Sequence, residues 1–461
     1  MKHKTKRSRW WLAPLSLLIL LVLTEMALRL IWEPPQEAVE EIVRLRPFYV
    51  VESQQNGVTT YVTNGNALPP PGVPPRVGDP RLLSPARFIM PKPADVIRIF
   101  VLGVSPIYGG LEMGGYNLSS YLLRDLKTAR PDLRFEVIDA AAQQMDSQML
   151  TEILGEINTF APDFILTYVG GAVPSVEAPG RHDLLGAEPF LFRLVVFVQD
   201  LRLVHLLGQS TRRKLLDSLF TLDHQANNEE EDVNIAENVR RMSEKVLVEG
   251  YHALAKAGAG SSARVAFYEI VTDLAGSPPL WSLHKKKLSK TEKTNFIQLL
   301  SAGKQALATG DHEQALTVLD QALAIDDTYA DVHYQRGLAL QAAGRGDEAY
   351  EAFVKAREAD ASHERLFAEP VKPLHDVLSQ YNLTLLPSGE SFRQASASGV
   401  PGRELFRDIT HPSQKGLAIL GRLGVEWMLP QLPPGGEGMP QPLPPPEAIM
   451  HKPLPGGPPV K

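Results

Sequence analysis

Three residues that lie far apart in the sequence have the types needed for nucleophilic catalysis. Ser105 directly follows an apolar segment, and Asp408 and His411 lie three positions apart near the other end of the chain. In such a set the hydroxyl attacks a carbonyl carbon, the imidazole takes up its proton, and the carboxylate orients the imidazole. Taken singly, each residue also has a simpler interpretation, with Ser105 as a helix N-cap, Asp408 as a capping residue and His411 as an exposed side chain.

The elements around these residues predict an α/β domain. Short apolar segments alternate with segments of helix length, which is typical of a parallel sheet covered by helices. Sites in such sheets form at the carboxyl ends of the strands, where Ser105 lies, and Pro106 suits the first position of a helix. The predicted strands are 97–102, 135–138, 164–169, 264–270 and 383–386, and the predicted helices are 116–129, 148–160, 233–256 and 412–427.

A helical repeat interrupts this pattern before the last predicted strand. Gly310 and Ala315 recur as Gly344 and Ala349, each 34 residues later, which is the tetratricopeptide period. Two repeats are fewer than an independent solenoid needs, so we expect them to pack on the α/β domain. Two roles remain open for this module: a helical hairpin without a partner, or a platform that binds a peptide or a protein.

The N-terminus predicts a membrane anchor. Residues 1–9 are rich in Lys and Arg, and residues 10–32 form an apolar run of roughly the length that crosses a bilayer as a helix. A cleaved signal peptide is the alternative, but the run is long for one and lacks a small-x-small cleavage motif. Glu25 lies one helical turn before Arg29 and is expected to pair with it. The basic end is expected to stay cytoplasmic, which predicts a single-pass membrane protein whose bulk is periplasmic or extracellular.

The composition excludes several classes of site. The formal net charge of -6 gives no electrostatic basis for nucleic-acid binding, and the absence of cysteine excludes disulfides, thiolate nucleophiles and Cys-ligated metals. The histidines have no metal-ligand spacing, so we expect neither a metal nor a cofactor. His284, with three lysines after it, indicates either a solvated linker or a contact with an anionic ligand or a membrane surface.

Several blocks of the sequence resemble the SGNH or GDSL-like hydrolases, and more closely the bacterial subgroup with an N-terminal anchor and tetratricopeptide repeats inserted before the last block. The blocks are 99–105, 135–141, 162–172 and 408–412, the last followed by Gly416, and segment 278–284 is also similar to the subgroup. Three positions depart from the family pattern. Val104 stands in place of Asp or Gly, Ala141 in place of Gly, and Ala172 in place of Asn.

The resemblance implies a three-layer α/β/α domain and ester hydrolysis through an acyl-enzyme. It makes Ser105 the nucleophile, His411 the general base and Asp408 the partner of His411. The family holds the oxyanion with backbone N–H groups, here those of Ser105 and Ala141, and with the Asn side chain that Ala172 replaces. Loss of one such donor typically costs about 10²–10³ in turnover, so the resemblance implies a depleted oxyanion hole.

Two functions follow from these features. The first is a membrane-anchored esterase or acyl hydrolase that acts on an O-acylated small molecule or glycan, with a cell-envelope glycan as the substrate class that the location indicates. The alternative is a catalytically impaired scaffold whose repeats bind a protein partner. The predicted organisation is a basic cytoplasmic tail (1–9), a transmembrane helix (10–32), a Pro-rich stalk (33–94), the first part of the SGNH-like domain (95–292), the repeats (293–362), the closing part of that domain (363–429) and a disordered Pro/Gly-rich tail (430–461).

Overall fold

The computed structural model describes most of the chain, which forms two compact units. One unit contains residues 1–40 and 177–238, and the other contains residues 41–176 and 239–461. Every described strand lies in the second unit. The described residues are 12–31, 47–65, 83–108, 116–142, 147–169, 228–362 and 371–434. The predicted basic tail, most of the predicted Pro/Gly-rich tail and Ala172 lie outside these residues.

In the first unit, α1 (Leu12–Ile31) is an apolar helix within the segment predicted to be a membrane anchor. Arg29 Nε donates a hydrogen bond to Glu25 Oε1 at 2.8 Å, as their spacing of one turn predicts. Of the residues that the structure describes, however, none belongs to a helix that is both long enough and apolar enough to cross a membrane. The predicted transmembrane helix over residues 10–32 is therefore not supported.

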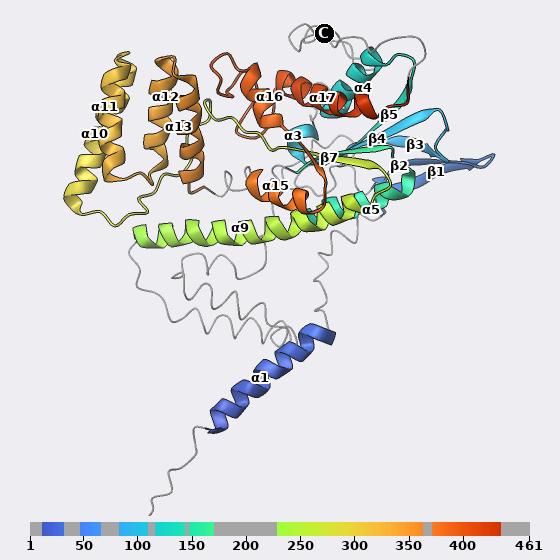
Figure 1. Cartoon of the computed structure of the whole chain (residues 1–461), viewed down its shortest axis with the longest axis horizontal. Coiled ribbons are helices and arrows are strands. Elements are labelled where there is room, and N and C mark those ends of the chain that lie inside the picture. Colours follow the sequence, from blue (N-terminus) through green and yellow to red (C-terminus); the bar gives the residue numbers. More distant parts are fainter. Residues whose placement is uncertain are drawn as a thin grey trace, which may run out of the picture. The chain divides into compact units, whose positions relative to one another are not determined.

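In the second unit, five strands among the described residues form one parallel sheet (Figure 1). Their order is β5-β4-β6-β7-β8, so the first of them in the chain lies between the second and the third. The boundary between β4 and β6 is thus the switch point at which sheets of this order form their sites. The strands are β4 (Val96–Gly103), β5 (Arg134–Ala141), β6 (Phe164–Tyr168), β7 (Arg264–Tyr268) and β8 (Thr384–Leu386), and each coincides with a segment predicted from the sequence.

Helices cover both faces of this sheet, which confirms the predicted α/β fold. Alternate residues of β4 point to opposite faces because the side-chain period of a strand is two. Ile99 and Val101 belong to one buried apolar cluster, together with residues of α4 and α17. Phe100 and Leu102 belong to another, together with residues of α5, α9 and α15. These helices are α4 (Leu118–Ala129), α5 (Ser147–Ile157), α9 (Asn228–Ala259), α15 (Val371–Gln380) and α17 (Gln414–Met428).

The prediction of a Pro-rich stalk is wrong for part of its length, which contributes a second sheet. Within the described residues, β1 (Tyr49–Gln55), β2 (Val58–Thr63) and β3 (Arg87–Met90) pair antiparallel in that order. A two-residue turn joins β1 to β2, and both of its residues, Asn56 and Gly57, have positive φ, as a type I′ hairpin turn requires. The many prolines nearby hid this signal, because they dominate the composition of the segment.

The repeat region folds into helix pairs that stack side by side (Figure 1). Its helices pack closely because small residues recur at the contact points. A Cβ at Gly303 would lie 2.6 Å from the side chain of Leu319, and a Cβ at Gly337, 34 residues later, would lie 2.9 Å from the ring of Phe353. The helices are α10 (Lys290–Ala308), α11 (His312–Ile325), α12 (Ala330–Ala342) and α13 (Gly346–Ala359).

Residues 280–285, the docking segment, lead into the repeats and bind to them. The carboxylate of Asp360 accepts hydrogen bonds from two backbone N–H groups at the start of this segment, at 2.8 and 3.0 Å. The carboxylate of Asp326, 34 residues earlier, contacts His284 Nδ1 at 2.7 Å, and the His284 ring packs 4.6 Å from that of Tyr329. Each repeat therefore binds the docking segment through an aspartate at the equivalent position of the repeat. The interpretation of His284 as a solvated linker residue is therefore wrong, although Lys286 and Lys287 after it are exposed. A contact of this segment with an anionic ligand or a membrane surface stays a prediction.

Candidate active site

Ser105 lies immediately beyond the carboxyl end of β4. Gly103 ends that strand, and a Cβ there would lie 2.6 Å from the carbonyl oxygen of Tyr168 on β6, so only glycine fits. Val104, which departs from the family pattern, is fully buried, whereas Ser105 is half-buried and begins the short helix α3 (Ser105–Tyr108). The serine is therefore the first residue after the strand that reaches solvent, at the switch point of the sheet.

Asp408 and His411 form a close pair in the loop before α17. His411 Nδ1 lies 2.8 Å from Asp408 Oδ1 and 2.9 Å from Asp408 Oδ2. The backbone N–H groups of Thr410 and His411 also donate to Asp408 Oδ1, at 3.0 and 2.9 Å. Because a carboxylate accepts and does not donate, the contact places the ring proton on Nδ1 and leaves Nε2 as the basic nitrogen. This is the arrangement that a histidine base requires.

The surroundings of Asp408 keep its carboxyl group ionised. Partial burial opposes ionisation, but the side-chain hydrogen bond and the charge of His411, together with the backbone N–H groups of His411 and Thr410, outweigh it and lower the pKa of Asp408 to about 2. The group is therefore a carboxylate throughout the neutral range. It can stabilise the imidazolium that forms when His411 takes up a proton.

Backbone hydrogen bonds attach the loop that carries this pair to the chain segment that follows β7. The backbone N–H of Asp273, five residues after β7, donates to the carbonyl oxygen of Ile409 at 2.9 Å. The backbone N–H of Arg407 donates to the carbonyl oxygen of His411 at 2.9 Å, which closes the loop on itself. Both β4 and β7 end at the same edge of the parallel sheet, so this loop and Ser105 lie at that edge.

Ser105 and His411 are not joined by a hydrogen bond in the described part of the chain. Catalytic hydrogen bonds are often long in the absence of substrate and tighten in the complex. The structure thus shows the pairing of His411 with Asp408, whereas the participation of Ser105 stays a prediction.

The backbone N–H of Ala141, predicted to bind an oxyanion, already has an acceptor. It donates to Asp139 Oδ1 at 2.9 Å. The other oxygen of Asp139 accepts hydrogen bonds from Ser84 Oγ at 2.9 Å and from Asn117 Nδ2 at 2.6 Å. An oxyanion at this point would have to displace Asp139 from Ala141. Of the donors implied by the resemblance, the backbone N–H of Ser105 is therefore the one on which the predicted oxyanion hole depends.

Asp139 itself was not singled out by the sequence analysis. Burial raises the pKa of its carboxyl group to about 7, although the hydrogen bonds from Ala141 and Ser84 partly oppose this effect. The signal in the sequence is an aspartate that directly follows the apolar residues Val137 and Ile138 near the end of β5, two residues before Ala141. Carboxylates with a raised pKa occur often at functional sites, and this one, which is half-buried, lies at the same edge of the sheet as Ser105.

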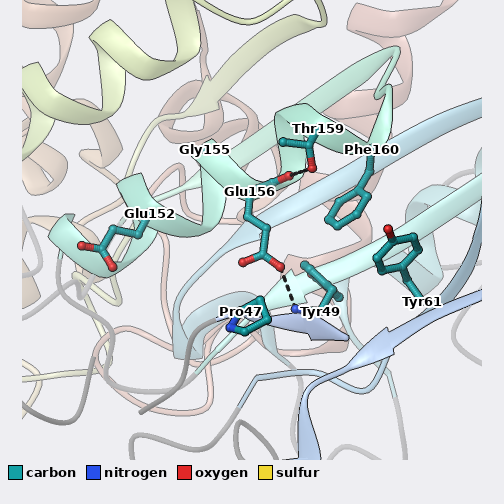
Figure 2. A pocket seen from close by; sticks show the side chains of 8 residues that line it. All are labelled: Pro47, Tyr49, Tyr61, Glu152, Gly155, Glu156, Thr159 and Phe160. Atoms are coloured by element: carbon teal, nitrogen blue, oxygen red, sulfur yellow. Dashed lines mark hydrogen bonds between the residues drawn. The ribbon is translucent and has the colours of Figure 1, made fainter. Parts of the chain in front are cut away.

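A cavity of about 620 Å³ lies elsewhere, between the antiparallel sheet and α5 (Figure 2). It contains none of the predicted catalytic residues. One of the two carboxylates that line it, Glu156, accepts hydrogen bonds from the backbone N–H groups of Phe48 and Tyr49 at 2.8 and 2.7 Å, so this carboxylate fixes the start of β1. Nor do the described residues include a group of three or more His, Asp or Glu side chains arranged to hold a metal ion.

Comparison with known proteins identifies the repeat region. The 34-residue period and the two helix pairs agree with the family model described as TPR repeat, which matches residues 303–344. The chain carries a tetratricopeptide repeat. This match covers the last third of α10 and all of α11 and α12, and it ends before α13. The tetratricopeptide module comprises residues 290–359.

For the chain as a whole the comparisons are less informative. The crystal structure of the lipase/acylhydrolase from Enterococcus faecalis is similar with a TM-score of 0.29 and 12% sequence identity, over 74% of this chain and 98% of that one. A TM-score this low does not establish a common fold. No curated protein matches the sequence.

Proposed function

We propose that this protein is a serine esterase or acyl hydrolase of the SGNH type, with Ser105 as the nucleophile, His411 as the general base and Asp408 as the partner of His411. The observation that carries the proposal is the contact of His411 Nδ1 with both oxygens of Asp408, which leaves Nε2 free of that pairing and basic. The position of Ser105 after β4 and the resemblance of four sequence blocks to the family support it.

In this mechanism His411 Nε2 takes the proton of the Ser105 hydroxyl as the oxygen attacks the carbonyl carbon of the ester. The resulting imidazolium is stabilised by the carboxylate of Asp408. The tetrahedral intermediate collapses when His411 returns the proton to the leaving alcohol, and an acyl group remains on Ser105. Water, deprotonated by His411, then attacks the acyl-enzyme and releases the acid.

The proposed substrate is an O-acylated small molecule or glycan. The rate expected of the enzyme is low, because Ala141 N–H is engaged by Asp139 and Ala172 lacks a side-chain donor. Removing one oxyanion donor typically costs about 10²–10³ in turnover.

A second candidate function has a specific observation in its favour. The bond from Ala141 to Asp139 and the alanine at position 172 would leave a hydrolase fold without an efficient oxyanion hole. In that case the protein is a catalytically impaired scaffold, and its tetratricopeptide module binds a protein partner.

Labelling by a fluorophosphonate probe distinguishes the two functions. The full-length protein should be labelled, and the Ser105→Ala and His411→Ala variants should not, because the probe reacts only with an activated serine. Ser391→Ala is a matched control, since that residue is half-buried on α16 (Ser388–Ala395) and, among the described residues, its hydroxyl bonds to the carbonyl oxygen of Pro387. The control should be labelled like the natural sequence.

The same preparations are then tested for hydrolysis of p-nitrophenyl acetate. A folded protein that is neither labelled nor active on this ester contradicts the enzymatic proposal and leaves the scaffold. Labelling that persists in Ser105→Ala shows that another serine is the nucleophile.

A further inference from the structure

The loop that carries Asp408 and His411 is connected to the tetratricopeptide module through consecutive hydrogen bonds. The first bond is the one from Asp273 N–H to the carbonyl oxygen of Ile409, at 2.9 Å. The backbone N–H groups of the next two residues, 274 and 275, both donate to the carbonyl oxygen of Pro401, at 3.1 and 3.0 Å. The hydroxyl of Tyr334 on α12 donates to the carbonyl oxygen of Ala275 at 2.7 Å. Residues 273–276, the bridging loop, thus contact the histidine loop on one side and the repeats on the other.

Apolar packing accompanies these bonds. Leu274 and Val400 are buried, and both belong to the hydrophobic cluster formed by the helices of the repeats. The ring of Tyr334 lies in the same cluster, 5.3 Å from that of Phe353. Residues of the α/β domain therefore contribute to the hydrophobic core of the module, as expected for two repeats that cannot form a complete core alone.

The bridging loop has its own internal restraint. The carboxylate of Asp273, which is fully buried, accepts from the backbone N–H of Gly276 at 2.7 Å and from Ser277 Oγ at 2.9 Å. Arg403 Nε donates to the carbonyl oxygen of Gly276 at 2.9 Å, and its guanidinium also donates to the carbonyl oxygen of Arg407 at 3.2 Å. A shift of the loop would accordingly be transmitted to Arg407, whose N–H bonds to His411.

A second contact joins the module to the same region. Gln341 Nε2 on α12 donates to Ser398 Oγ at 2.8 Å, and the ion pair of Arg393 with Asp347 of α13 lies nearby in the chain. Ser398 Oγ is also 3.4 Å from the carbonyl oxygen of Val400, one residue before Pro401. Helix α12 therefore contacts both segments that support the histidine loop.

We propose that the second tetratricopeptide repeat positions the histidine of the active site within its own chain, and that Tyr334 is the positioning residue that connects α12 to the loop of Asp408 and His411 through the bridging loop. The catalytic part of this inference rests on the proposed function, whereas the mechanical part does not. The module then acts on the α/β domain that contains it, in addition to any external partner.

The Tyr334→Phe variant tests the connection with little risk to folding, because the phenyl ring keeps its packing against Phe353 and only the hydroxyl is lost. Arg336→Ala is the matched control: it lies on the same helix and removes an ion pair with Asp320 that stays within the repeats. Hydrogen–deuterium exchange of the full-length protein is measured for the amides of residues 273–275 and of residues 407–411. Loss of one hydrogen bond should raise their exchange about 5-fold in Tyr334→Phe and leave it unchanged in Arg336→Ala.

The second readout is the rate of fluorophosphonate labelling of Ser105 as a function of pH. A displaced His411 should lower the rate by about 5-fold or more and move the midpoint of the pH profile in Tyr334→Phe alone. Unchanged exchange at residues 407–411, or equal effects of the two substitutions, overturns the positioning role. If the natural sequence is not labelled but the exchange changes as expected, the proposed enzymatic function fails and the connection stands.

Discussion

Replacing Asp139 by asparagine should change how the stability of the protein depends on pH. In the folded protein the carboxyl group accepts three hydrogen bonds, from Ala141 N–H, Ser84 Oγ and Asn117 Nδ2. Burial raises its pKa to about 7, from an ordinary value of about 3.9 in the unfolded chain. Asparagine keeps the volume and one acceptor oxygen, but it does not ionise, so it resembles the protonated acid at every pH.

The sign and the size follow from proton linkage. Because the folded state binds this proton more tightly than the unfolded state, the free energy of unfolding falls as the pH rises from about 4 to about 7 and is level above that range. At 1.36 kcal/mol per pKa unit, the cost of ionising Asp139 grows by about 3 kcal/mol between pH 5 and pH 8. This value is an upper bound, since the residue is only partly buried. In the Asp139→Asn protein this residue does not ionise, so it does not lower the free energy of unfolding as the pH rises.

Urea unfolding at pH 5 and pH 8, followed by circular dichroism, measures the effect. Relative to the natural protein, the free energy of unfolding of Asp139→Asn should be higher at pH 8 than at pH 5 by up to about 3 kcal/mol. The control is Asp95→Asn, because the hydrogen bond from Arg134 lowers the pKa of that exposed carboxyl below its ordinary value, so it stays ionised over the range compared. If the curves of Asp139→Asn and the natural protein run parallel between pH 5 and pH 8, the account of Asp139 is refuted.

Three further predictions concern positions that support the site. Gly103→Ala should lower stability by about 1–3 kcal/mol and abolish labelling of the serine, since the added Cβ meets the carbonyl oxygen of Tyr168; normal labelling in a stable variant would contradict the packing described. Asp360→Ala should cost about 1–3 kcal/mol in thermal or urea unfolding, because two partly buried hydrogen bonds to the N–H groups of the docking segment are lost, and a cost near zero would show that the segment does not bind there. Glu156→Ala should release the start of β1, seen as faster amide exchange in residues 48–51 with the labelling rate unchanged, and protected amides there would refute the role of Glu156.

Much of the α/β domain could be predicted because its central strands, β4 and β6, are mostly apolar and buried on both faces. Residues 99–102 show this clearly: none is polar, and the structure distributes them alternately between the two core clusters. The Asp408–His411 pair could also be predicted, since residues three apart before a helix form their contact locally. The repeats were visible because each helix pair repeats the same small and large residues after 34 positions.

The antiparallel sheet and the support of the histidine loop could not be obtained in the same way. The turn at Asn56 and Gly57 is a strong hairpin signal, but the prolines that follow favoured an extended stalk. The hydrogen bond from Tyr334 to Ala275 joins residues 59 positions apart, and no periodic pattern specifies such a pair. The surroundings of Asp139 depend on Ser84 and Asn117, which come from two separate segments.

The most direct test of the central proposal is to locate the adduct of a fluorophosphonate probe on the full-length protein by peptide mass spectrometry. The proposed mechanism predicts a single stoichiometric adduct on Ser105, lost in His411→Ala and strongly slowed in Asp408→Asn, which removes the carboxylate that orients His411. An unmodified Ser105 in a folded protein, or an adduct that forms equally well without His411, would contradict it.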